Sequence, residues 1–293
     1  MIPKLIPSPE ALITSHGATC AGFLAQAKAK NLKAAPYVKE ALKLWELLLK
    51  SEKASATIGT VPLNTLATAT GLSDKARRYF KDAELRRMIR ASLASIMKTA
   101  NHHFREEILY RYLLTRGDTL GGEMRNVTGA LAQAKFTKTL AQNLRRKGLK
   151  PVCKIVEKKI VQISWKNRVL LFDRTPALVN KNVDVILLEK PATACTDREL
   201  LSGSCPYIAF GELKGGIDPA GADEHWKTAR SALHRIREAF KESCPKLFFA
   251  GSAIQAAMAK EIFQQLNSGE LSHAANLTVE AQVQDLCAWL ASL

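Results

Sequence analysis

The spacing of apolar residues predicts helices in the first half of the chain. Apolar positions recur at intervals of three and four residues from Tyr37 to Lys53, and again in a long segment after Ser73, a candidate N-cap. Residues 54–72 contain glycine, proline and several threonines and are expected to form a loop. A further helical stripe runs through residues 104–113. We therefore expect a helical lobe over residues 1–115.

Three glycines are expected to interrupt this helical pattern at residues 117–126, which read Gly-Asp-Thr-Leu-Gly-Gly-Glu-Met-Arg-Asn. A helix should follow from about residue 126 to 147, with Gly148 as its C-terminal stop. Glu123 would then lie near the start of this helix. Its carboxylate is expected to cap the helix there, and a role at a metal site is the less favoured alternative.

The second half of the chain alternates between short strand patterns and helical patterns. Strands are expected at residues 152–156, 159–164, 168–172, 183–188, 207–214 and 246–250, and helices near 220–242, 253–266 and 279–293. A loop is expected at 190–205. Ser252 is a candidate N-cap for the helix predicted at 253–266. This alternation predicts an α/β domain with a mixed β-sheet flanked by helices over residues 116–293.

Ionisable residues occupy two of these predicted strands. Asp184 would project from the first, and Glu212 and Lys214, two residues apart in the second, would share one face. Burying two carboxylates and a lysine is unfavourable unless something offsets their desolvation. Mg²⁺, which prefers oxygen ligands, does so for the carboxylates and leaves the lysine to orient a water or neutralise a phosphate. The pattern predicts a metal-dependent phosphodiester-cleaving site, although so short a pattern also arises by chance.

The charge of the chain agrees with a polyanionic partner. The formal net charge is +16 and the pI is about 9.7, which favours nucleic acid over a ribosome-associated or merely basic protein. From Lys135 to Arg168 there are eleven Lys or Arg residues and one acidic residue. This run is expected to contact phosphates, with an ordinary solvated face as the alternative. Gly215 and Gly216 directly follow Lys214 and are expected to leave room for a phosphate.

Other classes of protein find little support in the sequence. The six cysteines form no C-x-x-C pair, so neither a zinc site nor a disulfide framework is expected. The sequence contains no nucleophile elbow, P-loop or dinucleotide-binding fingerprint. We see no signal peptide and no apolar run of membrane-spanning length. A cytoplasmic protein without a membrane partner is therefore expected.

One stretch of nineteen residues carries a family resemblance. Residues 211–229, Gly-Glu-Leu-Lys-Gly-Gly-Ile-Asp-Pro-Ala-Gly-Ala-Asp-Glu-His-Trp-Lys-Thr-Ala, resemble the catalytic segment of type II restriction endonucleases of the AvaI/BsoBI kind, within the PD-(D/E)xK superfamily. Residues 117–126 resemble a motif that is shared more loosely among restriction enzymes. The number of residues that separate Asp184 from Glu212 in the sequence also fits this family. Val183 stands where the wider superfamily has proline, which the chemistry does not need. For residues 1–110 no resemblance is claimed.

The resemblance implies a role for each residue of the site. Asp184 and Glu212 would bind Mg²⁺, and Lys214 would position or help to activate the attacking water. His225 would assist water activation, because an imidazole accepts a proton near neutral pH. The alternative for His225 is a helix histidine bonded to a backbone carbonyl.

The resemblance also implies how DNA would be recognised. Lys181, Asp218 and Glu224 would contact base edges in a G·C-rich palindrome such as CYCGRG, with plain surface charge as the alternative. A homodimer would match the two-fold symmetry of the double-stranded target and leave 5′-phosphate ends. A companion DNA methyltransferase is expected. Two other functions stay open: a structure-specific repair or junction-resolving nuclease of the same fold, and a non-catalytic basic DNA-binding protein.

Overall fold

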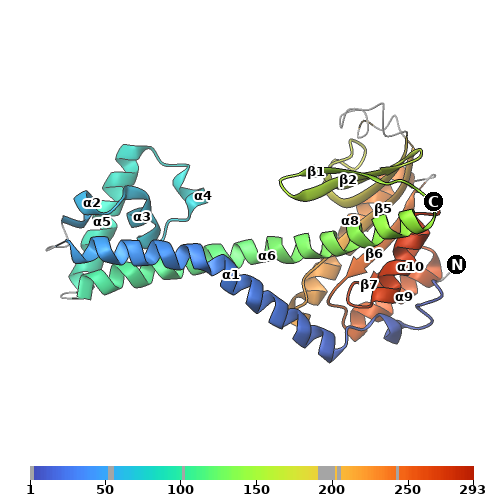
Figure 1. Ribbon diagram of the computed structural model, residues 1–293, viewed down its shortest axis with the longest axis horizontal. Coiled ribbons are helices and arrows are strands. Elements are labelled where there is room, and N and C mark those ends of the chain that lie inside the picture. The colour runs from blue at the N-terminus through green and yellow to red at the C-terminus, as the bar shows by residue number, and fades with distance from the viewer. Residues whose placement is uncertain (1–2, 52–55, 101–102, 191–201, 203–205, 242–243) are drawn as a thin grey trace. The chain divides into compact units, whose positions relative to one another are not determined.

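The computed structural model describes residues 3–51, 56–100, 103–190, 202, 206–241 and 244–293. Two compact units make up the chain: residues 25–126 form one, and residues 1–24 together with 127–293 form the other (Figure 1). The sequence predicted a division between residues 115 and 116. The units instead divide within two long helices, α1 (His16–Leu49) and α6 (Phe104–Arg146), each of which supplies residues to both.

The unit of residues 25–126 is helical throughout its described elements. Besides parts of α1 and α6 it contains α2 (Thr57–Thr60), α3 (Leu63–Ala69), α4 (Asp74–Arg77) and α5 (Asp82–Ala100). Its core is a single apolar cluster with one buried stripe from each long helix. The fully buried members of this cluster include Leu48, Leu66, Ala67, Ile89 and Ile108.

Two expectations for this unit were wrong. Residues 54–72 are not a plain loop, because α2 and α3 lie there, and Pro62 precedes α3 as its N-cap, where a missing N–H costs nothing. Ser73 caps a helix as expected, accepting a hydrogen bond from the Ala76 amide, but that helix is the single turn α4. The long helix α5 begins eight residues later, at Asp82.

The glycine-rich segment 117–126 does not form a turn. It continues α6 without interruption, and Gly117, Gly121 and Gly122 all keep negative φ angles. A glycine inside a helix costs up to about 1 kcal/mol relative to alanine. The burial of Tyr112 and Leu120 on one side of α6 outweighs that local preference.

Glu123 consequently lies in the middle of a helix, so the predicted capping role is wrong. Its carboxylate accepts a hydrogen bond from the Tyr37 hydroxyl at 2.6 Å and lies 3.7 Å from the Lys33 ammonium, both on α1. The bond to Glu123 raises the pKa of Tyr37 to about 12. Glu123 therefore joins α1 to α6, and we do not propose a metal role for it.

The other unit is built on one seven-stranded mixed sheet, in the order β1-β2-β3-β4-β5-β6-β7. Its strands are β1 (Val152–Val156), β2 (Lys159–Trp165), β3 (Arg168–Arg174), β4 (Val183–Glu189), β5 (Tyr207–Lys214), β6 (Lys246–Gly251) and β7 (His273–Asn276). The first five strands pair in antiparallel fashion, and β5, β6 and β7 are parallel. The mixed sheet was predicted; β7 was not, because four buried residues reading His-Ala-Ala-Asn show no alternation.

Helices cover both faces of this sheet. One face packs against α8 (Ala222–Phe240) and α9 (Ala256–Ser268), and the opposite face packs against the C-terminal part of α6 and α10 (Glu280–Leu290) (Figure 1). Alternation along the strands decides which residues face which layer. In β4, for example, Ile186 and Leu188 belong to the α8–α9 face, whereas Val185 and Leu187 belong to the α6–α10 face.

Short elements complete this unit. The 3-10 helix η1 (Pro9–Leu12) lies before α1, and η4 (Pro219–Gly221) lies between β5 and α8. The positive φ of Gly148 ends α6 as expected. Ser252 is not the cap of α9, since Gln255 holds that position. The expected loop at 190–205 lies almost wholly outside the described residues, as do Cys195 and Cys205. Among the described helices, none has the length and apolarity of a membrane span.

The packing of α6 on the sheet makes a prediction about stability. Phe136 of α6 is fully buried, with its ring centroid 6.2 Å from that of Phe172 and 6.4 Å from that of Phe248. Phe136→Ala should lower the free energy of unfolding by about 3–5 kcal/mol, because it removes apolar contacts and leaves a cavity. Leu131→Ala, at an exposed position of the same helix, should change it by less than about 0.5 kcal/mol. Urea-induced unfolding measures both, and equal effects would contradict this packing.

Candidate active site

The register of strands β3, β4 and β5 brings the predicted acidic residues together. Val185 pairs with Gly211, and the neighbouring positions Asp184 and Glu212 therefore lie side by side at the end of the two strands. Both residues have the same parity as Ile186 and Phe210, so their side chains project on the α8–α9 face of the sheet. Two carboxylates that are 28 residues apart in sequence thus meet on one surface.

Lys214 connects these two carboxylates. Its ammonium donates hydrogen bonds to Asp184 Oδ2 at 2.9 Å and to Glu212 Oε2 at 2.7 Å. Asp184 Oδ2 also accepts a hydrogen bond from the backbone amide of Leu213 at 2.8 Å. These contacts fix Asp184 from both the side chain and the backbone of β5. The structure therefore brings together three of the four predicted catalytic residues.

The environment of the cluster makes Glu212 an unusual carboxyl group. It is only 3% exposed, and burial together with the charge of Asp184 raises its pKa to about 7 despite the opposing effect of Lys214. Burial lowers the pKa of Lys214, but the two carboxylates outweigh it and hold the pKa above its ordinary value. Lys214 therefore stays protonated near neutral pH, while Glu212 is poised to gain or lose a proton.

A third acidic residue, Asp173, was missed by the sequence analysis. It lies between the pairs Phe172–Val185 and Arg174–Val183, so it stands opposite Asp184. Burial and the charge of Asp184 raise its pKa, whereas the charges of Lys159 and Arg174 lower it. Its φ of 51° falls in the left-handed region. Strand alternation gives no sign of such a residue, and the predicted strand ended one position before it.

The donor set of this cluster fits a hard divalent cation. Asp184 and Glu212 offer carboxylate oxygens, which Mg²⁺ prefers, and the raised pKa of Glu212 shows that the site favours added positive charge. Among the described residues no three His, Cys, Asp or Glu side chains gather as a metal site. A cation bound here would therefore need further oxygen ligands from water or substrate.

His225 lies against the loop that follows Lys214. A Cβ placed on Gly216 would be 2.8 Å from His225 Nε2, and one placed on Gly221 would be 3.7 Å from it. The imidazole is exposed and forms no hydrogen bond within the described part of the chain. The alternative interpretation, a histidine tied to a backbone carbonyl, is therefore not what the structure contains.

The two glycines after Lys214 have a different purpose from the expected one. The position of a Cβ on Gly215 lies 2.4 Å from the carbonyl oxygen of Thr128 on α6, and that on Gly216 is filled by the imidazole of His225. On the next residue, Ile217 occupies the space in which Gly22 of α1 would carry a Cβ. The glycines therefore let the loop pack tightly and do not leave open space on their Cα atoms.

Helix α8 is fixed against α9 close to His225. Trp226 is buried, and its indole N–H donates to Glu261 at 2.8 Å. Arg230 also donates to the same carboxylate oxygen at 2.8 Å. Because Trp226 faces the core between α8 and α9, the next-door side chain of His225 projects from the exposed side of α8. Trp226 was not singled out from the sequence.

With this geometry established, known proteins provide the comparison. The family model described as "Restriction endonuclease BsobI" matches residues 3–293. The chain belongs to this family of type II restriction endonucleases. It is 40% identical to the type II restriction enzyme AvaI of Nostoc sp. and to that of Anabaena variabilis, with 98% of each chain covered. It is 38% identical to the type II restriction enzyme BsoBI of Geobacillus stearothermophilus, over 98% of this chain and 97% of the relative.

Membership extends the resemblance beyond the motifs on which it was recognised. The sequence stretches at 117–126 and 211–229 suggested the family, whereas the match also covers the N-terminal residues for which no resemblance was claimed. The restriction-endonuclease fold expected from the second half, with its mixed sheet, flanking helices and additional helical region, is confirmed.

The three residues that are expected to contact DNA bases are all exposed. Lys181 and Glu224 form no side-chain bond with any described residue. Asp218 accepts a hydrogen bond from the amide of Ala220 at 3.0 Å and so caps η4, which occupies one of its oxygens. Asp218 lies in the loop after Lys214, and Glu224 lies in the first turn of α8 next to His225. Their accessibility permits contact with DNA, and their role stays a prediction.

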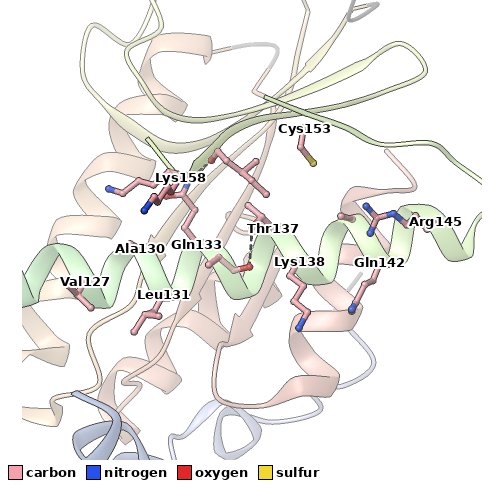
Figure 2. Close-up of a pocket in the computed structure, with 14 residues that line it drawn as sticks. Val127, Ala130, Leu131, Gln133, Thr137, Lys138, Gln142, Arg145, Cys153 and Lys158 are labelled. Atoms are coloured by element: carbon pink, nitrogen blue, oxygen red, sulfur yellow. Dashed lines mark hydrogen bonds between the residues drawn. The ribbon is translucent and has the colours of Figure 1, made fainter. Parts of the chain in front are cut away.

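The basic run from Lys135 to Arg168 divides into two groups in the structure. Lys135, Lys147 and Arg168 donate to carbonyl oxygens of the C-terminal region, so they hold the chain together. The remaining members include Lys138, Arg145, Lys158 and Lys159, which line a groove of about 590 Å³ between α6 and the β1–β2 hairpin (Figure 2). Contact between this run and phosphates stays a prediction, and the second group offers it several exposed cations in one groove.

The raised pKa of Glu212 predicts how stability depends on pH. The unfolded carboxyl titrates near 4.5 and the folded one near 7, so Glu212 favours the folded state most at low pH and this advantage is lost as pH rises through 7. The free energy of unfolding of Glu212→Gln, taken relative to wild type in EDTA, should be roughly 2–3 kcal/mol higher at pH 8 than at pH 5. The exposed neighbour Glu224→Gln should gain nothing. Thermal unfolding at both pH values measures this, and a pH-independent difference would refute it.

Proposed function

We propose that this chain is a type II restriction endonuclease that cuts both strands of duplex DNA in a Mg²⁺-dependent reaction. The observation that carries the proposal is the convergence of Asp184, Glu212 and Lys214 on one face of the sheet. The relatives named AvaI and BsoBI, aligned over nearly the whole chain, support the class of reaction.

In this proposal the carboxylates of Asp184 and Glu212 would hold the Mg²⁺ ion. When bound, the cation supplies charge neutralisation and Lewis acidity at the phosphate. The Lys214 ammonium has three donors, and its fixed place beside both carboxylates lets it orient the attacking water and stabilise negative charge on a phosphate oxygen.

His225 is proposed to receive the proton of the attacking water. Its imidazole is accessible and has no partner within the described residues that would compete for its nitrogens. The water oxygen forms a bond to phosphorus as the bond from phosphorus to the 3′ oxygen breaks. The 3′ oxygen gains a proton from solvent, which leaves a 3′-hydroxyl and a 5′-phosphate.

Sequence specificity is proposed to come from exposed polar residues close to the site. Lys181 can donate to guanine O6 and N7, and the carboxylates of Asp218 and Glu224 can accept from the cytosine amino group. This chemistry favours a G·C-rich palindrome, for which CYCGRG is our candidate. A homodimer would place one active site on each strand, and a companion methyltransferase would protect host DNA.

The first test removes a proposed metal ligand. Asp184→Ala should lower the rate of plasmid cleavage with Mg²⁺ by roughly 10³-fold or more, since a loss of about 4 kcal/mol in transition-state stabilisation has that size. DNA binding measured by gel shift should persist. The matched control is Asp223→Ala, which removes an exposed carboxylate whose ion pair among the described residues is with Lys227, and it should cut normally.

The same digest separates the rival functions. Discrete fragments whose ends share one sequence support a restriction endonuclease. Structure-specific nicking without defined bands favours a repair or junction-resolving nuclease. Intact DNA with Mg²⁺, together with a gel shift, identifies a non-catalytic DNA-binding protein. If Asp184→Ala cuts DNA at the wild-type rate, the assignment of the active site is wrong.

The second test concerns His225. His225→Ala should lower the single-turnover cleavage rate by roughly 10²–10⁴-fold, the usual contribution of a positioned general base. The loss should be smaller at high pH, where hydroxide replaces the base. His234→Ala, an exposed histidine on the same helix, should keep the wild-type rate and pH profile. An equal loss at every pH would indicate a structural role instead.

A further inference from the structure

A strongly cationic corner lies on the helical unit, remote in sequence from the catalytic residues. We call residues 75–90, where α4 leads into α5, the α4–α5 corner; they contain seven Lys or Arg and two acidic residues. Its free cations are exposed side chains without a bond to any described residue: Lys75, Arg78, Lys81, Arg86, Arg87 and Arg90. So many unpaired cations in sixteen residues favour a polyanionic partner.

Two aromatic side chains project among these cations. Tyr79 is 82% exposed, more than any other large hydrophobic side chain in the described chain, and Phe80 is 40% exposed. A single exposed aromatic residue is ordinary on a protein surface. Here the pair lies between Arg78 and Lys81, so an apolar partner protein would have to bury those charges. A partner that presents phosphate beside flat sugar and base surfaces satisfies both kinds of side chain.

The backbone of the corner is held in place while its side chains stay free. Ser73 caps α4, and the Asp74 carboxylate binds Arg77 at 3.2 Å and Arg116 of α6 at 2.8 Å. The amides of Tyr79 and Phe80 donate to the carbonyl oxygens of Ala76 and Arg77. Binding therefore orders side chains only, which lowers its entropic cost.

We propose that the α4–α5 corner binds the sugar–phosphate backbone of duplex DNA. The arginines and Lys81 contact phosphates, and Tyr79 packs against the sugars. Four of the six free cations are arginine, whose planar guanidinium matches two phosphate oxygens at once. This inference rests on the proposed function, since it assumes the same substrate, and adds a binding surface that the active site does not include.

The test measures DNA affinity of the full-length protein in EDTA, where cleavage does not occur. The probe is a short fluorescent duplex, and the variant is Arg78→Ala/Arg86→Ala/Arg87→Ala/Arg90→Ala. Near 0.1 M KCl the affinity should fall at least about tenfold. The slope of log affinity against log salt should drop by about 0.9 for each phosphate that the variant no longer neutralises. Tyr79→Ala alone should weaken binding severalfold with an unchanged salt slope.

A matched variant separates a local contact from loss of overall charge. Lys28→Ala/Lys30→Ala/Lys39→Ala/Lys43→Ala removes four exposed cations from α1 and should leave the affinity within about threefold of wild type. An equal loss in both quadruple variants would overturn the proposal. Replacing the same four arginines by lysine keeps the charge and should retain most of the affinity. Because Tyr79→Ala is mild, unchanged affinity in that variant would count against the proposal even if the alanine variant fails to fold.

Two further outcomes are decisive. Polyglutamate should compete poorly for the corner, and competition equal to that of unlabelled duplex would assign the surface to an acidic protein. If the wild type cuts DNA but the arginine variant binds as tightly as the wild type, the corner proposal fails and the proposed function stands. If the wild type neither cuts nor binds DNA, the proposed function fails and the corner proposal fails with it.

Discussion

The contact on which the site depends is the bridge that one ammonium makes between two carboxylates. Lys214 lies within 3 Å of both Asp184 and Glu212, and Glu212 is almost completely buried. Without Lys214, two negative charges would face each other in a poorly solvated place. The ammonium makes their proximity tolerable but does not remove its cost, as the raised pKa of Glu212 shows. Such a residual imbalance favours the binding of a cation.

The rest of the sheet unit can be understood as the support for this bridge. Strand register places Asp184 beside Glu212, alternation aims both toward α8 and α9, and the helix packing fixes the direction of His225. The loop between Lys214 and α8 is held by α1, α6 and His225 itself. A cluster with unfavourable electrostatics requires this rigidity, because any freedom would let the charged groups separate into solvent.

Sequence reasoning was most successful where apolar periodicity was strong. The strand at 207–214 was predicted with the bounds that the structure has, and β1 to β4 and β6 were found to within two residues. The convergence of Asp184, Glu212 and Lys214 was foreseen from strand parity, and His225 only from the family resemblance. Asp173 was missed because its position depends on a left-handed residue in β3, which no alternation pattern signals.

The failures share a physical origin in tertiary packing. Three glycines in residues 117–126 have a local preference for a turn, yet α6 passes through them because its buried face continues on both sides. Strand β7 is too short and too uniformly buried to alternate. Glu123 was assigned to a helix start that does not exist, and its true partner, Tyr37, lies 86 positions away in sequence.

The close approach of Gly215 to Thr128 changes how a mutational survey of this chain would be interpreted. Any side chain at position 215 would collide with the backbone of α6. Random substitutions there would abolish activity as completely as substitutions of Lys214 next to it, although glycine has no functional group to contribute. Loss of activity alone would therefore make Gly215 look like a catalytic residue, although its substitution acts through a steric clash. Only a measurement of folding together with activity would distinguish a substitution of Gly215, which adds a clashing side chain, from a substitution of Lys214, which removes an amine.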